Sequence, residues 1–209
     1  MIENNSKNLE KIFNFLHKIE NLKSTYRYNK TSAGEKESSA DHSWRLALTT
    51  FIIADELKLQ LDITKSIKIA LVHDLAEALT GDIDAILIAE GKASAEDKNR
   101  QEVEAINNLK KTLPETIGNE ISNLWNEYED GKTQEAKFVK ALDKIETLTQ
   151  LAESGYKTYD KPEFIANYAN KAVTKFPELT EMLKILKKKL KLEFHKGNIE
   201  WNDEYDSLN

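Results

Sequence analysis

The stretch Ser66-Ile-Lys-Ile-Ala-Leu-Val-His-Asp-Leu-Ala-Glu-Ala-Leu-Thr-Gly-Asp82 decides how this chain folds. Its apolar residues recur at helical spacing, and Gly81 is a residue type favoured just past a helix C-terminus, so we predict a helix from about Thr64 to Leu79. At about 100° per residue, His73 and Glu77 share one helix face and Asp74 lies beside it. Burying these ionisable groups without a partner would cost several kcal/mol, so we expect a bound cation there.

Two residues elsewhere complete a ligand set for one divalent ion, namely His42 and Asp143. Imidazole nitrogen suits Mn, Fe, Co, Ni or Zn, and carboxylate oxygen leaves the ion acidic enough to polarise a phosphoryl group. Asp143 interrupts an apolar helix face, where an unpaired carboxylate is rare. The set His42, His73, Asp74 and Asp143 therefore suggests a metallohydrolase.

The amino-acid composition limits the number of domains, the possible chemistry and the cellular location of the protein. A length of 209 residues with 40% apolar content, 3 Pro and 7 Gly fits one compact domain over residues 1–209. The absence of Cys excludes a disulfide framework, a thiolate zinc site and a Cys nucleophile. The N-terminus lacks the apolar core of a signal peptide, and no apolar run approaches the roughly 20 residues needed to cross a bilayer. We expect a cytoplasmic protein with no membrane partner.

The charge balance bears on binding partners. A net charge of −6 argues against a protein that binds long nucleic acid, whereas small phosphorylated ligands remain open. The basic run from Lys187 to Lys191 is interpreted as a solvated helix face, with a role toward a partner or an anion as the alternative. Trp44, Trp125 and Trp201 are expected to be packing residues. His17 and His195 lie outside any motif and are expected at the surface.

The helical period dominates the whole chain and predicts an all-α bundle of about eight helices. Besides the helix from Thr64 to Leu79, the expected helices run over 9–19, 42–57, 94–109, 114–130, 136–151, 162–175 and 177–194. No strand-like alternation persists. Residues Thr25 to Ser39 form one long polar segment without periodicity, which we interpret as a functional loop because it directly precedes His42.

Three segments carry a resemblance to a known family: Glu37-Ser-Ser-Ala-Asp-His-Ser-Trp-Arg45, Val72-His-Asp-Leu-Ala-Glu-Ala-Leu-Thr-Gly-Asp-Ile83 and Glu135-Ala-Lys-Phe-Val-Lys-Ala-Leu-Asp-Lys-Ile-Glu146. They resemble the HD-domain phosphohydrolases, and more narrowly the 5′-deoxynucleotidase family that includes YfbR and the eukaryotic HD domain-containing protein 2. The resemblance runs from about Leu9 to Leu186 and leaves a C-terminal helix and tail to residue 209. It implies a single HD domain that forms a homodimer.

The resemblance also implies roles for the motif residues. His42, His73, Asp74 and Asp143 would bind one divalent ion, which could be Mn, Co, Mg, Ni, Fe or Zn. Glu77 and Asp82 would be the catalytic acidic residues that act on the attacking water and the leaving group. This agrees with the chemistry, because a nearby carboxylate can accept a proton from a metal-acidified water. Glu77, Asp82 and the carbonyl of Ile83 would match a second ion site.

The resemblance places a substrate-binding Arg-aromatic pair at Arg27-Tyr28. Arg suits bidentate phosphate contact, and an aromatic ring can pack on the sugar or base. The aromatic is commonly Trp in the family and is Tyr here. Substrate contacts are also expected from Asp82, Ile83, Asp84 and Ala85, in a segment where the family often has a Pro.

These observations predict hydrolysis of 5′-deoxyribonucleoside, or ribonucleoside, monophosphates to nucleoside and phosphate. One alternative is another HD phosphohydrolase, such as a phosphodiesterase, an alarmone hydrolase or a nucleoside triphosphohydrolase, which should need more phosphate-binding cations or extra domains. The second alternative is a non-catalytic HD-fold binding protein. Loss of Glu77 or Asp82 would favour it, and both residues are present.

Overall fold

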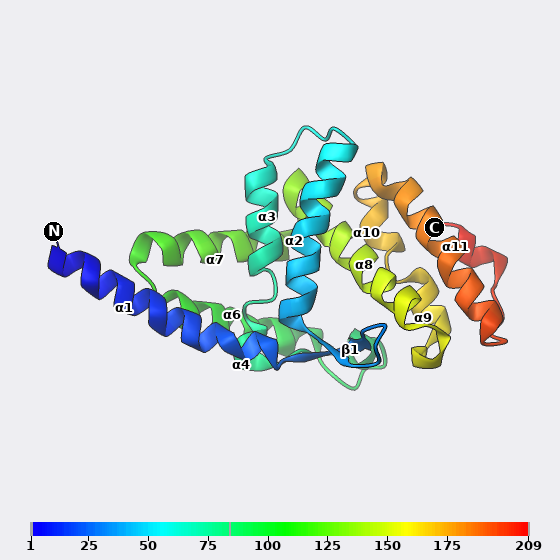
Figure 1. The fold of residues 1–209 in the computed structure, drawn as a ribbon, viewed down its shortest axis with the longest axis horizontal. Helices are drawn as coiled ribbons and strands as arrows, with labels where there is room; N and C mark the ends of the chain where they lie inside the picture. Colours follow the sequence, from blue (N-terminus) through cyan, green and yellow to red (C-terminus); the bar gives the residue numbers. More distant parts are fainter. Residues whose placement is uncertain (1, 84, 209) are drawn as a thin grey trace.

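A computed structural model describes residues 2–83 and 85–208, which are mostly helical (Figure 1). Asp84, predicted to contact substrate, lies outside the described residues. In chain order the α-helices are α1 (Ile2–Ile19), α2 (Ser39–Glu56), α3 (Ile63–Val72), α4 (Glu77–Thr80), α5 (Ala85–Ala89), α6 (Ala95–Lys110), α7 (Glu115–Asp130), α8 (Gln134–Ser154), α9 (Pro162–Asn167), α10 (Asn170–Thr174) and α11 (Thr180–Lys196). Short 3₁₀ helices are η1 (Glu20–Lys23), η2 (Tyr156–Thr158), η3 (Pro177–Leu179) and η4 (Asp203–Asp206).

The predicted all-α class is confirmed. Two of the predicted helices are interrupted, giving α3 with α4 and α9 with α10, and α5 is an additional short helix in a predicted loop. None of the described helices combines the length and the apolar character needed to cross a bilayer.

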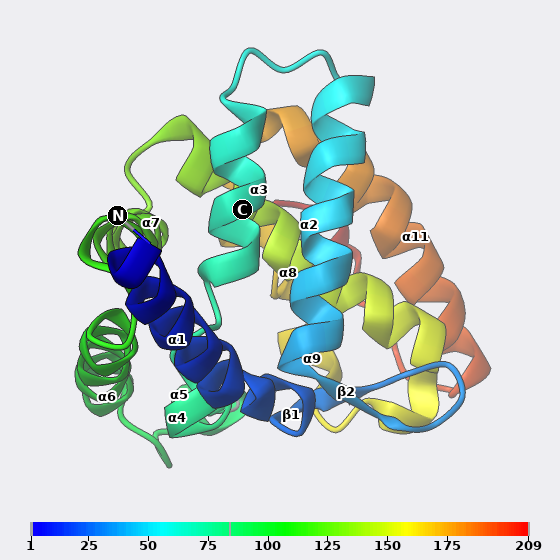
Figure 2. The ribbon, with the colours of Figure 1, turned by 60° about the vertical axis from the view of Figure 1, so that its left-hand side comes forward.

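Helix α8 is the centre of the bundle. It contacts α2, α3, α7, α10 and α11, and in Figure 2 it lies behind α2 and α3. Its side chains Phe138, Leu142, Ile145 and Leu148 are fully buried. Because burying one large apolar side chain contributes about 1.5–3 kcal/mol, this helix is fixed firmly in the core. The polar residues on its remaining face are therefore held in defined positions.

The start of α2 is set by a capping box. The Ser38 hydroxyl accepts a hydrogen bond from the Asp41 amide at 3.1 Å, and the Asp41 carboxylate accepts one from the Ser38 amide at 3.0 Å. The helix thus begins at Ser39, three residues before the predicted start at His42. As a result His42 lies inside the first turn, where its side chain is fully buried.

The predicted helix from Thr64 to Leu79 is broken at His73. Helix α3 ends at Val72 and α4 begins at Glu77. Between them the amides of Leu75, Glu77 and Ala78 bond to carbonyls three residues earlier rather than four, at 3.0 to 3.2 Å. This tighter winding is typical of a 3₁₀ turn. Both His73 and Glu77 still line the same pocket.

The segment from Thr25 to Ser39 was predicted as a loop, and that prediction is wrong. It forms an antiparallel hairpin of β1 (Tyr26–Lys30) and β2 (Lys36–Ser38). The hairpin is fastened to α8, because Gln150 Nε2 donates to the Lys30 carbonyl at 2.7 Å and Asn29 Nδ2 donates to the Thr147 carbonyl at 3.4 Å. These polar contacts replace the apolar alternation by which a strand is usually recognised.

Two predictions about individual side chains are also wrong. Trp44, predicted to pack in the core, is 65% exposed, whereas Trp125 and Trp201 are buried as predicted. Lys187, placed on a solvated face by the sequence, is buried. Its ammonium donates to the carbonyls of Ser207, at 2.9 Å, and Tyr205, so it holds the C-terminal segment against α11.

Candidate active site

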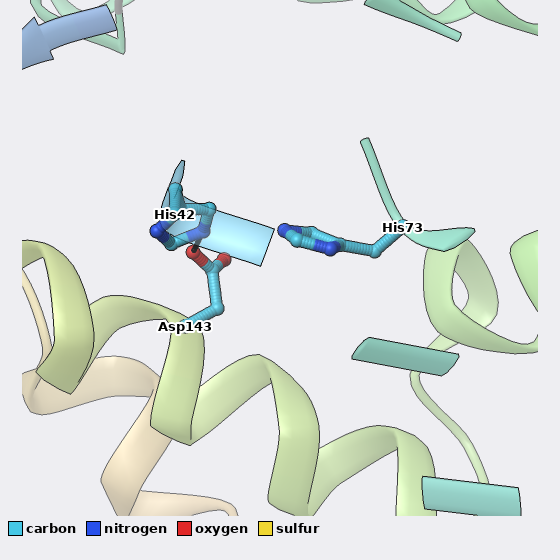
Figure 3. Close-up of side chains that lie close together, drawn as sticks. All are labelled: His42, His73 and Asp143. Carbon is cyan, nitrogen blue, oxygen red and sulfur yellow. Dashed lines mark ion pairs between the residues drawn. The ribbon is translucent and has the colours of Figure 1, made fainter. Parts of the chain in front are cut away.

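Three predicted metal ligands converge in the interior from three different helical segments. His42 comes from α2, His73 follows α3, and Asp143 comes from α8 (Figure 3). Their ligand atoms all lie within 4.8 Å of one another, and all three residues are buried. His42 Nε2 is 3.1 Å from Asp143 Oδ1, and the two imidazole centroids are 5.3 Å apart. Such a spacing brings two nitrogens and a carboxylate oxygen around one point.

The hydrogen bonds of the two imidazoles fix which nitrogen faces that point. His73 Nδ1 lies 2.8 Å from the Ala70 carbonyl, which can only accept, so Nδ1 carries the proton and Nε2 a free lone pair. His42 Nδ1 bonds in the same way to the Glu146 carboxylate. Both Nε2 atoms are buried and have no hydrogen-bond partner among the described residues. Two buried Nε2 atoms without hydrogen-bond partners, beside a carboxylate, fit a divalent cation.

The electrostatics of His42 agree with a site for positive charge. Burial and the Arg27 guanidinium act to lower the pKa of His42, but Glu146 and Asp143 outweigh them and raise it to about 10. In the metal-free protein a proton therefore lies on Nε2 toward Asp143, at the position that a bound cation would take. Asp143 is held ionised: although burial opposes this, Lys144 and His42 keep its pKa well below the usual range. The carboxylate also accepts a 2.7 Å hydrogen bond from the Tyr128 hydroxyl. The carboxylate is therefore charged and oriented.

The fourth predicted ligand, Asp74, lies beside the two imidazoles. Its Oδ1 is 3.1 Å from His73 Nε2, and its Oδ2 is 3.9 Å from His42 Nε2. Oδ2 also accepts a 3.2 Å hydrogen bond from Arg27. Burial acts to raise the pKa of Asp74, but His73, Arg27 and His42 lower it below its ordinary value. Asp74 thus lies beside the two imidazoles and Arg27, outside the close group that His42, His73 and Asp143 form.

The pKa of Glu77 is shifted in the opposite direction from the pKa values of Asp74 and Asp143. Glu77 is 4% exposed, and its Oε2 accepts a 2.6 Å hydrogen bond from the Ser39 hydroxyl. Burial, followed by the negative charges of Asp74 and Asp82, raises the pKa of Glu77 well above its ordinary value. A carboxyl whose pKa is raised in this way holds its proton more readily than an ordinary glutamate, which suits a residue that transfers protons. Asp82 and Ile83 line the same pocket, and Ala85 is the first residue of α5.

The pocket lined by these residues has a volume of about 280 Å³, and its lining is of two chemical kinds. The polar lining includes His73, Asp74, Glu77, Asp82 and Asp143. The apolar lining consists of Ile83, Ile86, Ile88, Leu151, Phe164 and Ile165. Small-molecule sites commonly combine such an apolar wall with a few fixed polar groups.

Arg27 and Tyr28 both line this pocket. Arg27 reaches α8 as well, where it donates to the Thr147 hydroxyl at 3.2 Å. The Tyr28 hydroxyl donates to the Thr158 carbonyl at 2.7 Å and accepts from the Asp160 amide at 3.0 Å, so it ties the hairpin to the segment after η2. The predicted pair is thus at the pocket, and each member also anchors the hairpin.

Several cations of the pocket wall were not among the residues predicted from the sequence. Lys98, Lys140 and Lys144 line the pocket together with Arg27. Helical spacing offered a signal, because Lys140, Asp143, Lys144, Thr147 and Leu151 recur on one face of α8. The ammonium of Lys140 lies 4.1 Å from the Tyr128 ring centroid, a cation–π contact.

Comparison with known proteins agrees with this geometry. Residues 19–185 match the family model described as HD domain. Human 5′-deoxynucleotidase HDDC2 is 35% identical over 70% of this chain and 69% of its own length. The Xenopus laevis protein of the same name is 37% identical, with 70% of each chain covered. The fold is similar to a crystal structure titled as a predicted metal-dependent phosphohydrolase from Magnetospirillum magnetotacticum, with a TM-score of 0.76 and 23% identity over 93% of this chain and 100% of that one. The chain, in which two histidines and Asp143 surround one buried point with Asp74 beside the histidines, belongs to the HD-domain family.

Proposed function

We propose that this protein is a metal-dependent phosphomonoesterase that hydrolyses 5′-deoxyribonucleoside or ribonucleoside monophosphates to nucleoside and phosphate. One observation carries the proposal: the buried Nε2 atoms of His42 and His73 lack hydrogen-bond partners and face the Asp143 carboxylate. The names of the curated relatives support the substrate class, because both are called 5′-deoxynucleotidases. The proposed ligands are His42, His73, Asp74 and Asp143.

In the proposed mechanism the protein groups divide the proton transfers. A divalent ion at this site would supply a Lewis acid for the phosphoryl group and for the attacking water. Glu77 and Asp82 line the pocket beside the ligands. One would accept the proton of the water, and the other would donate a proton to the departing 5′ oxygen. Together with the carbonyl of Ile83, the same two residues would provide a second ion site.

The remaining pocket residues suggest how the substrate is oriented. Arg27 and Lys140 contribute cationic groups to the pocket lining, which suits the phosphate. Tyr28 and the apolar wall with Phe164 offer surfaces for the sugar and base. Substrate contacts from Asp82, Ile83, Asp84 and Ala85 stay part of this proposal.

The cations of the pocket bear on the main alternative, a hydrolase of nucleoside di- or triphosphates. Such substrates need several cations for their additional charge. Among the described residues, Arg27 is paired with Asp74, Lys98 with Glu102, and Lys144 with Asp143. No ion pair of Lys140 is found in the same part of the chain. This balance, with a cavity of about 280 Å³, favours a substrate with a single phosphate.

The decisive experiment measures phosphate release after chelation and reloading with Mg, Mn, Co, Ni or Zn. The substrates are deoxyribo- and ribonucleoside mono-, di- and triphosphates, and the metal-free protein is the control. Hydrolysis of monophosphates that depends on the added metal is expected. If no monophosphate were hydrolysed with any metal, the proposal would be wrong, and preferential triphosphate hydrolysis would favour the alternative.

We also propose that the protein is a homodimer. Support comes from an apolar surface over α2 and α3, where Trp44, Leu48, Phe51 and Leu71 are 44–65% exposed and border a shallow groove. Contiguous apolar surfaces often mark interfaces. Light scattering during gel filtration should give a dimer mass, and Phe51→Lys should lower it. The matched control is Leu192→Lys, an equally apolar exposed residue on α11.

Two broader predictions also remain as proposals. The chain is expected to form one domain over residues 1–209, which limited proteolysis would test. It is expected in the cytoplasm, which imaging of the tagged full-length chain would test.

A further inference from the structure

A chain of charged side chains leads from the protein surface to His42. Glu146 lies on α8, one turn after Asp143, and its Oε2 contacts His42 Nδ1. Its Oε1 accepts a 2.5 Å hydrogen bond from Arg45 Nε. Arg45 also donates from its Nη1 to Glu153 Oε2 at 2.6 Å. The Glu146 side chain is 1% exposed and that of Glu153 is 48% exposed, so the chain begins in the core and ends in solvent.

This arrangement determines the state of the His42 ring. A carboxylate oxygen accepts hydrogen bonds, so Nδ1 of His42 carries a proton toward Glu146. Nε2 is thereby the ring nitrogen that faces Asp143 and His73 and is available to a cation. Arg45 compensates the charge of Glu146, which a nearly buried carboxylate requires.

Glu146 could instead bind an ion itself, because Glu37, His42 and Glu146 form a second close group. The contacts argue against this role. Both Glu146 oxygens are already engaged, one by His42 and one by Arg45. Glu37 Oε2 lies 3.5 Å from Arg27 Nε, on the side of another guanidinium. An ion there would have to displace the hydrogen bond between His42 and Glu146 and would lie close to two cations, Arg27 and Arg45.

The two imidazoles differ in how they are held. His73 is oriented by the Ala70 backbone carbonyl, a group present whatever side chain occupies that position. His42 is oriented by a side chain. The orientation of His42 can therefore be altered by a substitution that removes no ligand.

We infer that Glu146 is a positioning residue that fixes the tautomer and the ring orientation of His42, and that Arg45 holds Glu146 in place. The inference rests on the proposed binding of a divalent ion by His42. Partners in this outer position commonly change metal affinity by about 10- to 100-fold when they are mutated.

The test measures metal binding directly, by competition of Mn²⁺ with a chelating dye and by the visible spectrum of the Co²⁺-loaded protein. Glu146→Gln keeps the size of the side chain but offers one acceptor atom to two donors. We expect its Mn²⁺ affinity to fall by about 10- to 100-fold and its Co²⁺ spectrum to change. Glu153→Gln, at the exposed end of the same chain, is the matched control and should stay within about twofold.

A second variant guards against a folding defect in Glu146→Gln. Arg45→Lys keeps the positive charge but loses the guanidinium fork, so it should weaken Mn²⁺ binding in the same direction and by less. Retention of wild-type affinity and spectrum by both variants would overturn the inference while the proposed function stands. The loss of one of two bound ions in Glu146→Gln would overturn it too, by making Glu146 a ligand.

The proposed function can fail separately. A wild-type protein that binds Mn²⁺, loses affinity in Glu146→Gln and hydrolyses no nucleotide would support the positioning role and refute the nucleotidase activity. A wild-type protein that binds none of the metals would overturn both.

Discussion

Replacing Arg27 with Ala should affect both the stability of the protein and its activity, because this side chain connects three elements at the pocket. Its guanidinium lies 3.2 Å from Asp74, 3.2 Å from the Thr147 hydroxyl and 3.5 Å from Glu37. The Arg27 side chain is 12% exposed and that of Glu37 is 3% exposed. The substitution thus leaves carboxylates with little access to water and without their cation.

The size of the effect follows from that burial. Breaking a buried ion pair by removing one partner costs about 3–5 kcal/mol. The lower end is expected here, because burial and the charge of Glu146 already raise the pKa of Glu37, so this residue can take up a proton instead. Urea unfolding of the metal-free protein should therefore show a loss of about 3 kcal/mol. The double variant Arg27→Ala with Glu37→Gln should recover part of it.

Arg100→Ala is the matched control. Arg100 pairs with Asp97 on the surface of α6, its side chain is 74% exposed, and its loss should cost at most about 0.5 kcal/mol. In activity assays, Arg27→Ala should lower kcat/KM for a deoxynucleoside monophosphate by about 10- to 100-fold, the equivalent of one charge-assisted contact. A small generic phosphate ester should be affected less. Destabilisation below about 1 kcal/mol, with nucleotide hydrolysis unchanged, would refute both roles of Arg27.

Four further results are expected. Glu77→Gln should lower kcat by about 10²- to 10⁴-fold while elemental analysis still finds metal, and an unchanged kcat would remove Glu77 from the mechanism. Asp143→Ala should lower the metal-to-protein ratio, so stoichiometric tight metal in that variant would contradict the ligand assignment. Lys140→Met should raise KM for monophosphates by about tenfold with metal affinity unchanged, since it removes a cation from the pocket. In the chelated protein the raised pKa of His42, about 10, gives stability that is complete below about pH 6.5 and is lost as pH rises toward 10. Bound Mn²⁺ should reduce this loss. The prediction would be contradicted if the free energy of unfolding in urea fell by the same amount between pH 6.5 and 9 with and without Mn²⁺.

The convergence of His42, His73 and Asp143 could be predicted from sequence because buried polar residues are restricted in type. His73 and Asp74 interrupt an apolar helix. Polar groups at such positions are removed from water, so they need a bonding partner within the protein or a bound ion. Asp143 carried the same signal within a buried helix. The lysines on α8 share a helix face with Asp143, but this spacing alone does not distinguish them, since a Lys on a helix is usually solvated. Only the packing of α7 against α8 shows that Lys140 lies over the Tyr128 ring.

The hairpin and the break at His73 could not be predicted from hydrophobic periodicity. The hairpin contains five residues in β1 and three in β2, and side-chain hydrogen bonds to α8 fasten it there. The break leaves the apolar pattern intact, because winding by three residues instead of four keeps neighbouring turns in contact. Both features depend on partners distant in the sequence.

Helix α8 has a consequence for how substrate preference could evolve. Its pocket face and its core face alternate within single turns, so a substitution that reshapes the pocket there also disturbs packing around Leu142 and Ile145. The hairpin and α9 contribute Tyr28 and Phe164 to the pocket without forming the centre of the core. Libraries that randomise these peripheral positions should yield altered selectivity more often than libraries along α8, because a substitution there disturbs neither Asp143 nor the packing of α8.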